Sequence, residues 1–171
     1  DLLSNALKRF NNLGGDPVIE LQTNFGGGKT HSMLALFHLC SGVSLDKLPG
    51  LEELCNEIDI SSIPRASRAV FVGTAFEPAT VDIKPDGTKI NTIWGELAWQ
   101  LGGKEGFSKI AESDLQKTPP GNRVLADLLN SYGPCLVLID EWVAYGRKII
   151  NKSDLPAGTL DAQLSFAHEL T

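Results

Sequence analysis

The feature that most constrains the fold of this chain is a glycine-rich segment ending in lysine and threonine, residues 26–30 (GGGKT). A short apolar run, residues 17–21, precedes it, and a long apolar stretch, residues 31–40, follows. Glycines let a backbone curl so that several N–H groups point at an anion, and the next helix offers further free N–H groups to it. Strand, glycine loop, lysine and helix is therefore the order that phosphate binding requires. An ordinary glycine turn with an exposed lysine is the alternative.

Different residues of this segment are expected to contact the phosphates, the metal ion and the rest of the nucleotide. Lys29 reaches the β- and γ-phosphates and has a catalytic role, and the Thr30 hydroxyl is a ligand for Mg²⁺. Thr23 stands where the usual pattern has Gly or Ala, which makes the entry turn of the loop less permissive. For His31, packing of the helix is the alternative to nucleotide contact. The residues predicted to bind ATP are Asn24, Phe25, Gly26, Gly27, Gly28, Lys29, Thr30 and His31.

A second chemical feature follows about 110 residues later, where an apolar run, residues 135–140 (CLVLID), ends in acidic side chains. A P-loop NTPase needs an acidic element at the end of another core strand, to hold Mg²⁺ and position water. Asp140 is predicted to hold the metal through a water, and Glu141 to polarise the attacking water as general base. An acidic pair that only caps the next helix is the alternative. The two motifs predict each other, so together they favour an Mg²⁺-dependent ATPase.

The remaining pattern alternates between strand-like and helix-like segments. Residues 17–22 and 69–75 join 135–140 as predicted strands, because they are apolar or rich in β-branched and aromatic residues. Residues 80–92 carry a Pro-Asp-Gly turn and predict a surface hairpin or an ordered loop. This alternation predicts an α/β fold with a largely parallel sheet. Helices are expected within 1–12, 31–40, 49–58, 92–101, 106–117, 122–132, 141–149 and 160–170.

Composition excludes several classes of protein. The formal net charge is −6, which argues against nucleic-acid binding through bulk charge. Hydrophobic residues make up 42%, as in a globular domain, and no apolar run is long enough for a membrane span. No signal peptide precedes the first helix. Three scattered cysteines (Cys40, Cys55 and Cys135) form no CxxC pair, so we expect buried thiols in a cytoplasmic protein without a membrane partner.

Three segments, TNFGGGKTH, IWGELAWQLGG and GPCLVLIDEWVAYGR, together resemble a family of large prokaryotic AAA+ ATPases that often lie near restriction or phage-defence genes. The likeness runs from about Gly14 to the last helix and includes Thr23. It implies a three-layer α/β/α P-loop core in which a further strand follows residues 160–170. Residues 1–171 are then the N-terminal part of an AAA+-like ATPase domain. The family also implies a ring or other homo-oligomer. The acidic charge of the chain predicts that this part of the protein contacts DNA only indirectly if at all.

The predicted function is therefore ATP binding and hydrolysis within a larger protein. A nucleotide-dependent switch or scaffold that binds ATP with little hydrolysis is the main alternative. A P-loop kinase is disfavoured because the chain has no arginine-rich lid, and a purely structural domain requires both motifs to be coincidental. Weaker candidates are Thr74 as a γ-phosphate sensor and Arg147 as an arginine finger, against simple strand-end and surface roles. Trp94 and Trp99 are expected in the core and at the surface of one helix.

Overall fold

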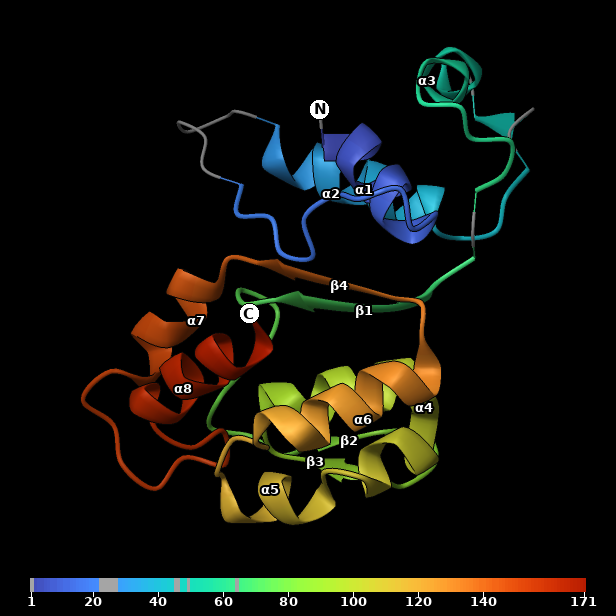
Figure 1. The fold of residues 1–171 in the computed structure, drawn as a ribbon. Helices are drawn as coiled ribbons and strands as arrows, with labels where there is room; N and C mark the ends of the chain where they lie inside the picture. The colour runs from blue at the N-terminus through green and yellow to red at the C-terminus, as the bar shows by residue number, and fades with distance from the viewer. Residues whose placement is uncertain (1, 22–27, 45–46, 49, 64) are drawn as a thin grey trace. The chain divides into compact units, whose positions relative to one another are not determined.

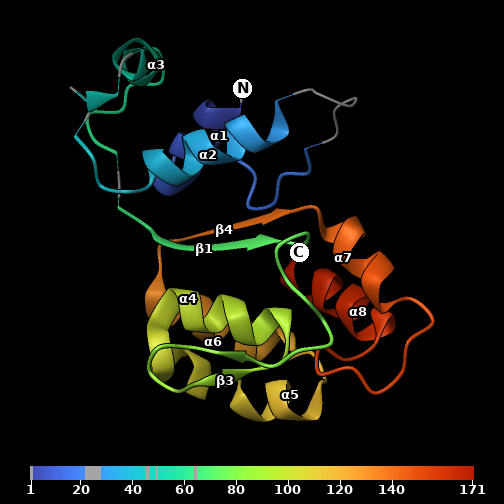
Figure 2. The ribbon, with the colours of Figure 1, turned by 180° about the vertical axis from the view of Figure 1, so that it is seen from behind.

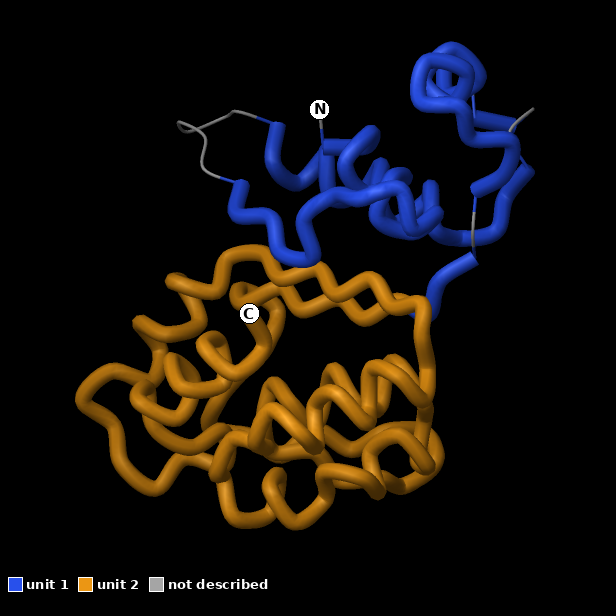
Figure 3. The backbone as a smooth tube through the Cα atoms, viewed as in Figure 1, with its two compact units in different colours: residues 1–67 blue, residues 68–171 orange. Residues whose placement is uncertain are grey.

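A computed structural model of the chain describes residues 2–21, 28–44, 47–48, 50–63 and 65–171. The chain divides into two compact units, residues 1–67 and residues 68–171, which Figure 3 distinguishes by colour. Each unit is described by itself below. The fold is mixed α/β and about half helical, with one small parallel sheet, so the expected α/β class holds at this coarser level.

The first unit is helical in its described part. It contains α1 (Leu2–Phe10), α2 (Lys29–Leu39) and α3 (Leu51–Glu57). Helices α1 and α2 contact each other, with Leu7 of α1 and Leu39 of α2 almost fully buried. The apolar spacing of the sequence predicts all three helices. The N-cap residue of α3 is Gly50, so no side chain caps this helix. Pro49, the first residue of the helix predicted within 49–58, lies outside the described residues.

The predicted strand at residues 17–22 is wrong in its described part. Residues 17–21 adopt no regular structure, and Val18 and Ile19 are each 40% exposed. A strand forms only where a neighbour completes its hydrogen bonds, and no strand in the described residues pairs with this run. The apolar stretch 31–40 lies largely within α2, as expected, but this helix is not fully buried, because Leu34 is 50% exposed.

The second unit is built around two strands, β1 (Ser67–Val72) and β4 (Cys135–Asp140), which pair in parallel. A hairpin follows β1 and consists of β2 (Asp82–Ile83) and β3 (Lys89–Ile90), paired antiparallel with Asp82 opposite Ile90. The turn chemistry of the sequence predicted this hairpin. The helices of the unit are α4 (Ile93–Ser108), α5 (Ala111–Gln116), α6 (Asn122–Tyr132), α7 (Trp142–Ile149) and α8 (Leu160–Leu170).

Helices α4 and α6 lie on one side of the β1–β4 sheet in both views of the ribbon (Figures 1 and 2). The core of the unit forms there, where alternate residues of β1, Ala69 and Phe71, pack with residues of α4 and α6. Trp94 is almost fully buried in this core and Trp99 is only half-buried, as the sequence predicted. Helix α4 is kinked at Gly102 and Gly103, whose backbone angles are not helical. The regular helix therefore ends at these glycines, as the sequence predicted, and a further short helical segment follows as far as Ser108.

A buried carboxylate fixes the start of α4. Asp114 of α5 accepts hydrogen bonds from the backbone and side chain of Asn91 and of Thr92, at 2.6 to 3.2 Å. Thr92 in turn caps α4 by accepting from the Gly95 N–H. A Cβ at Gly95 would lie 2.2 Å from the Asp114 Oδ1, so this close approach admits only glycine. The Trp94-Gly95-Glu96 segment is therefore explained by packing.

A second polar contact joins the hairpin to α4. The Lys84 Nζ lies 2.6 Å from the buried carboxylate of Glu96 and 2.8 Å from the exposed carboxylate of Asp82. Burial alone lowers the pKa of Lys84, but the hydrogen bonds and charges of Asp82 and Glu96 outweigh burial, and the pKa is raised overall. Gln100 donates to Glu96 at 2.7 Å and also binds both backbone groups of Val70, at 2.7 and 2.8 Å. One amide thus occupies the outer edge of β1.

We expect Asp114→Ala to lower the free energy of unfolding by about 3 kcal/mol, because it leaves several donors of Asn91 and Thr92 unpaired in the interior. Denaturant unfolding followed by circular dichroism measures the loss. Asp127→Ala is the control, since Asp127 is exposed and pairs with Lys109 at the surface. Similar losses in both variants would contradict the anchoring role of Asp114.

Lys84→Met should cost about 2 kcal/mol at pH 7, because it leaves the Glu96 carboxylate buried without its cation. The pKa of Lys84 is higher in the folded than in the unfolded chain, so its stabilisation is complete below the ordinary value of 10.5 and is lost as the pH rises through the folded value. The deficit of the variant should therefore shrink above pH 10.5. Urea unfolding at pH 7 to 11 tests this, and a constant deficit would refute it.

Candidate functional site

The acidic pair lies at the carboxyl end of β4. Asp140 is the last residue of the strand and is half-buried, and Glu141 is exposed and precedes the first turn of α7. The Glu141 N–H donates to Asp140 Oδ1 at 2.9 Å, so the two residues form one compact turn. Among the described residues the Glu141 carboxylate makes no hydrogen bond or ion pair. It is therefore available to a ligand or to water.

The backbone of Glu141 is in the left-handed region, with φ 52° and ψ 33°. Residues other than glycine, asparagine and aspartate rarely adopt this backbone conformation, which costs them of order 1 kcal/mol or more. The other described left-handed residues that are not glycine are Asn12, Asp59, Lys117, Asn151 and Asp154, most of which are the tolerant types. A glutamate at this turn is thus a costly choice for stability alone, and such strain is concentrated at functional sites.

The loop after β1 lies against the same turn. The Gly73 N–H donates to the Asp140 carbonyl oxygen at 2.9 Å. A Cβ at Gly73 would lie 2.2 Å from the carbonyl oxygen of Glu141, so a larger residue would push the two strand ends apart. Thr74, the candidate γ-phosphate sensor, follows directly and is exposed. The carboxyl ends of both parallel strands therefore meet at one edge, which is where open α/β sheets bind ligands.

Helix α7 holds this loop in place. Lys148 donates from Nζ to the carbonyl oxygens of Phe76, at 2.6 Å, and Thr74, at 3.3 Å. Tyr145, one turn earlier, is buried edge-on against Phe71, whose ring stacks on that of Phe76. Burial raises the pKa of Tyr145, and the charge of a nearby glutamate adds to this shift. Tyr145 therefore acts as a neutral packing residue and Lys148 as a clamp on the loop.

The described part of the predicted phosphate loop forms the start of α2. Gly28 is left-handed, with φ 76°, and Lys29 begins the helix. Thr30 and His31 follow in the first turn and are exposed. A lysine and a threonine in the first turn after a left-handed glycine match the local geometry that the phosphate-loop hypothesis requires. The predicted contacts of Asn24, Phe25, Gly26 and Gly27, and the departure at Thr23, lie outside the described residues.

The structure thus brings together the members within each half of the predicted site. Gly28 to His31 share the start of α2 in the first unit, and Thr74, Asp140 and Glu141 share one sheet edge in the second. The juxtaposition of Lys29 and Thr30 with Asp140 and Glu141 stays a prediction.

Comparison with known protein families finds a match. A family model described as the DUF499 N-terminal domain matches residues 1–159, which is most of the chain. The chain belongs to the DUF499 family. No curated protein and no solved structure matches the chain. The DUF499 description names no reaction, ligand or partner.

Other candidate chemistries find no support within the described residues of this DUF499 domain. No group of three or more His, Cys, Asp and Glu side chains in this part of the chain could hold a metal ion by itself. The three cysteines are present as thiols, of which Cys40 and Cys55 are buried and Cys135 is half-buried. Burial raises the pKa of the Cys55 and Cys135 thiols, which favours their unreactive form. None of the described helices combines the length and apolarity needed to cross a bilayer.

We expect Glu141→Asn to raise the free energy of unfolding by about 1 kcal/mol, because asparagine tolerates the left-handed conformation better than glutamate. Thermal and denaturant unfolding measure the change. Glu105→Asn, at an exposed helical position, is the matched control and should be slightly destabilising. A loss of stability in Glu141→Asn would show that the glutamate is held there by packing.

Proposed function

We propose that the chain is the nucleotide-binding part of a P-loop ATPase that binds ATP and hydrolyses it with Mg²⁺. The observation that carries the proposal is the Glu141 carboxylate, which is exposed, without a partner among the described residues, and held in a strained turn at the end of β4. A fold stabilised only by packing gains nothing from a glutamate there, whereas a general base for water needs this exposed, fixed position.

In this proposal the chain's residues divide the work. The N–H groups of the glycine loop and of the α2 start bind the phosphates, and Lys29 stabilises the negative charge that develops on them. Glu141 accepts a proton from the attacking water, which Asp140 and the loop after β1 help to orient. The Thr30 hydroxyl and the Asp140 carboxylate fit Mg²⁺, which prefers such oxygen ligands. When bound, the ion neutralises charge on the phosphate oxygens.

The finer fold, a three-layer P-loop core, belongs to the same proposal. Gln100 occupies the outer edge of β1, so further strands can add to this sheet only beside β4. The face of the sheet opposite α4 and α6 is also apolar, since it carries Val70 and Val72 of β1 and Leu136 and Leu138 of β4. Parallel sheets with two apolar faces carry helices on both. These features support a larger sheet than the two described strands.

The resemblance to large AAA+ ATPases extends the proposal to the whole protein. We infer a cytoplasmic, ring-forming or otherwise assembled ATPase that works in restriction or phage defence. An arginine from a neighbouring subunit would complete the site in such an assembly. The net charge of −6 supports a role in which this part of the protein does not itself bind DNA.

Nucleotide binding and turnover test the proposal in the chain and in the full-length protein. We expect Glu141→Gln to retain binding of a fluorescent ATP analogue and to lower kcat about 100-fold, because it removes the base. Lys29→Ala should instead weaken nucleotide binding at least about tenfold, because a charged phosphate contact is lost. Glu105→Gln, which removes an exposed carboxylate elsewhere, is the control and should change neither quantity.

The outcomes separate the alternatives. Equal hydrolysis by wild type and Glu141→Gln would contradict the role given to Glu141. Tight Mg²⁺-dependent ATP binding without turnover in the full-length protein would support a nucleotide switch instead. Absence of ATP binding in the full-length protein would refute both.

A further inference from the structure

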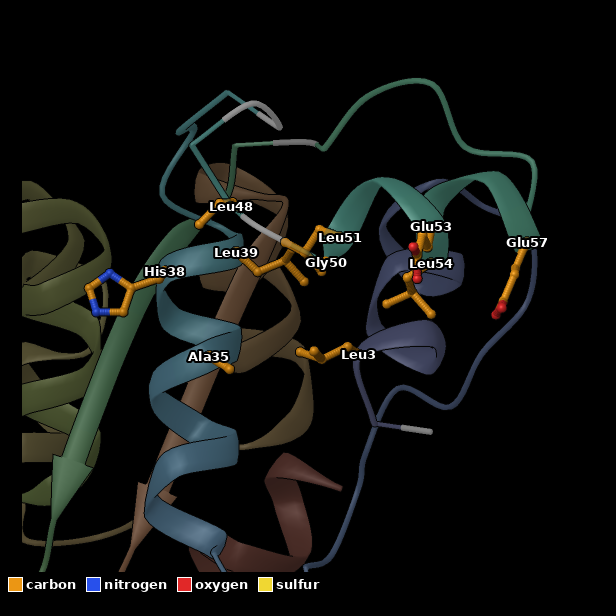
Figure 4. Close-up of a pocket in the computed structure, with 10 residues that line it drawn as sticks. All are labelled: Leu3, Ala35, His38, Leu39, Leu48, Gly50, Leu51, Glu53, Leu54 and Glu57. Carbon is orange, nitrogen blue, oxygen red and sulfur yellow. The ribbon is translucent and has the colours of Figure 1, made fainter.

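The first unit contains an apolar groove outside the proposed nucleotide site. Its cavity measures about 500 Å³ and lies among α1, α2 and α3. In Figure 4, Leu3 of α1, Leu39 of α2 and Leu54 of α3 point toward the space between these helices. Leu39 is almost fully buried at the base of the groove, whereas Leu3 and Leu54 are half-buried and Ala35 is exposed. The walls therefore keep apolar surface in contact with solvent.

The rim of the groove on α3 is acidic. Glu53 and Glu57 line the groove, stand one helical turn apart and are exposed. Neither makes an ion pair or hydrogen bond within the described residues. Helix α3 also carries Glu52 and has no basic residue. The groove thus combines a leucine-lined floor with a row of uncompensated negative charge along one side.

We propose that this groove docks an amphipathic helix of a partner protein, with leucine-like anchors on one face and lysine or arginine along its edge. Apolar anchors spaced at three and four residues would fill the space between the leucines of α1, α2 and α3, as helices do in apolar grooves. Basic residues one turn apart on the docked helix would face Glu53 and Glu57, which repeat at the same spacing. The charge of the rim selects a basic partner over an acidic one of equal apolarity.

Two synthetic helical peptides of about 16 residues test the docking, since shorter helices are marginal in water. Both carry the same leucine stripe, and one has a lysine edge where the other has a glutamate edge. Fluorescence anisotropy with the labelled peptides measures binding to the whole 171-residue chain. We expect the lysine peptide to bind at least about tenfold more tightly, and its binding to weaken as salt rises.

Variants on the two sides of the groove locate the binding. Glu53→Gln with Glu57→Gln should remove most of the preference for the lysine peptide. Ala35→Trp should block both peptides by filling the groove from an exposed position, with circular dichroism unchanged. Glu105→Gln with Glu112→Gln, a matched pair of exposed carboxylates in the second unit, should leave binding unchanged.

Five results would overturn the proposal. Four are failure of the lysine peptide to bind, equal binding of the two peptides, loss of binding in the second-unit control, and no effect of the groove variants. The fifth is sedimentation that shows the free chain as a dimer, dissociated by the glutamate substitutions, which would assign the groove to a second copy. None of these measurements involves nucleotide, so the result is independent of the proposed ATPase.

Discussion

The parallel pairing of β1 with β4 is the contact on which the second unit and its candidate site depend. It brings together the carboxyl ends of two strands that are far apart in sequence. At this edge the Gly73 N–H donates a hydrogen bond to the Asp140 carbonyl oxygen. The left-handed backbone of Glu141 packs closely against Gly73, and this backbone contact maintains the strained conformation of the glutamate. Lys148 then fixes the loop after β1 from the side of α7. The acidic turn is therefore rigid although it is exposed.

Helices that are specified by their own capping residues and apolar spacing could be predicted from the sequence. Residues 122–132 form α6 with the predicted bounds, and the predicted helix at 160–170 is α8, which Thr159 caps by accepting from the Ala162 N–H. The strand predicted at 17–22 failed in its described part because pairing depends on a neighbouring strand, and local apolarity does not encode one. The glycines predicted to end a helix do interrupt α4 at a kink, and Gly106 is buried in the short segment that follows.

The candidate site was predictable where residue type carries the chemistry. Asp140 and Glu141 stand at the strand end that the sequence predicted. A helix follows the glycine segment as expected, although it begins at Lys29, two residues before the predicted start. Gly73 and Lys148 were missed, because their roles come from contacts between segments far apart in the chain. A glycine after a β-branched strand is a weak sign of close backbone approach, so Gly73 had a signal. Lys148 had no such signal, because the sequence does not distinguish a solvated surface lysine from one that binds the carbonyl oxygens of a loop.

The amide of Gln100 that occupies the edge of β1 also bears on how the second unit assembles. Val70 and Gln100 are 30 residues apart, less than half the separation of the two strands. Closing the shorter loop costs less chain entropy, so α4 can hold β1 extended before β4 arrives. In the folded unit the Gln100 amide binds both backbone groups of Val70 at the exposed edge of β1, which limits pairing of that edge with a strand of another molecule. A single glutamine thus blocks one edge of β1, while the other edge pairs with β4.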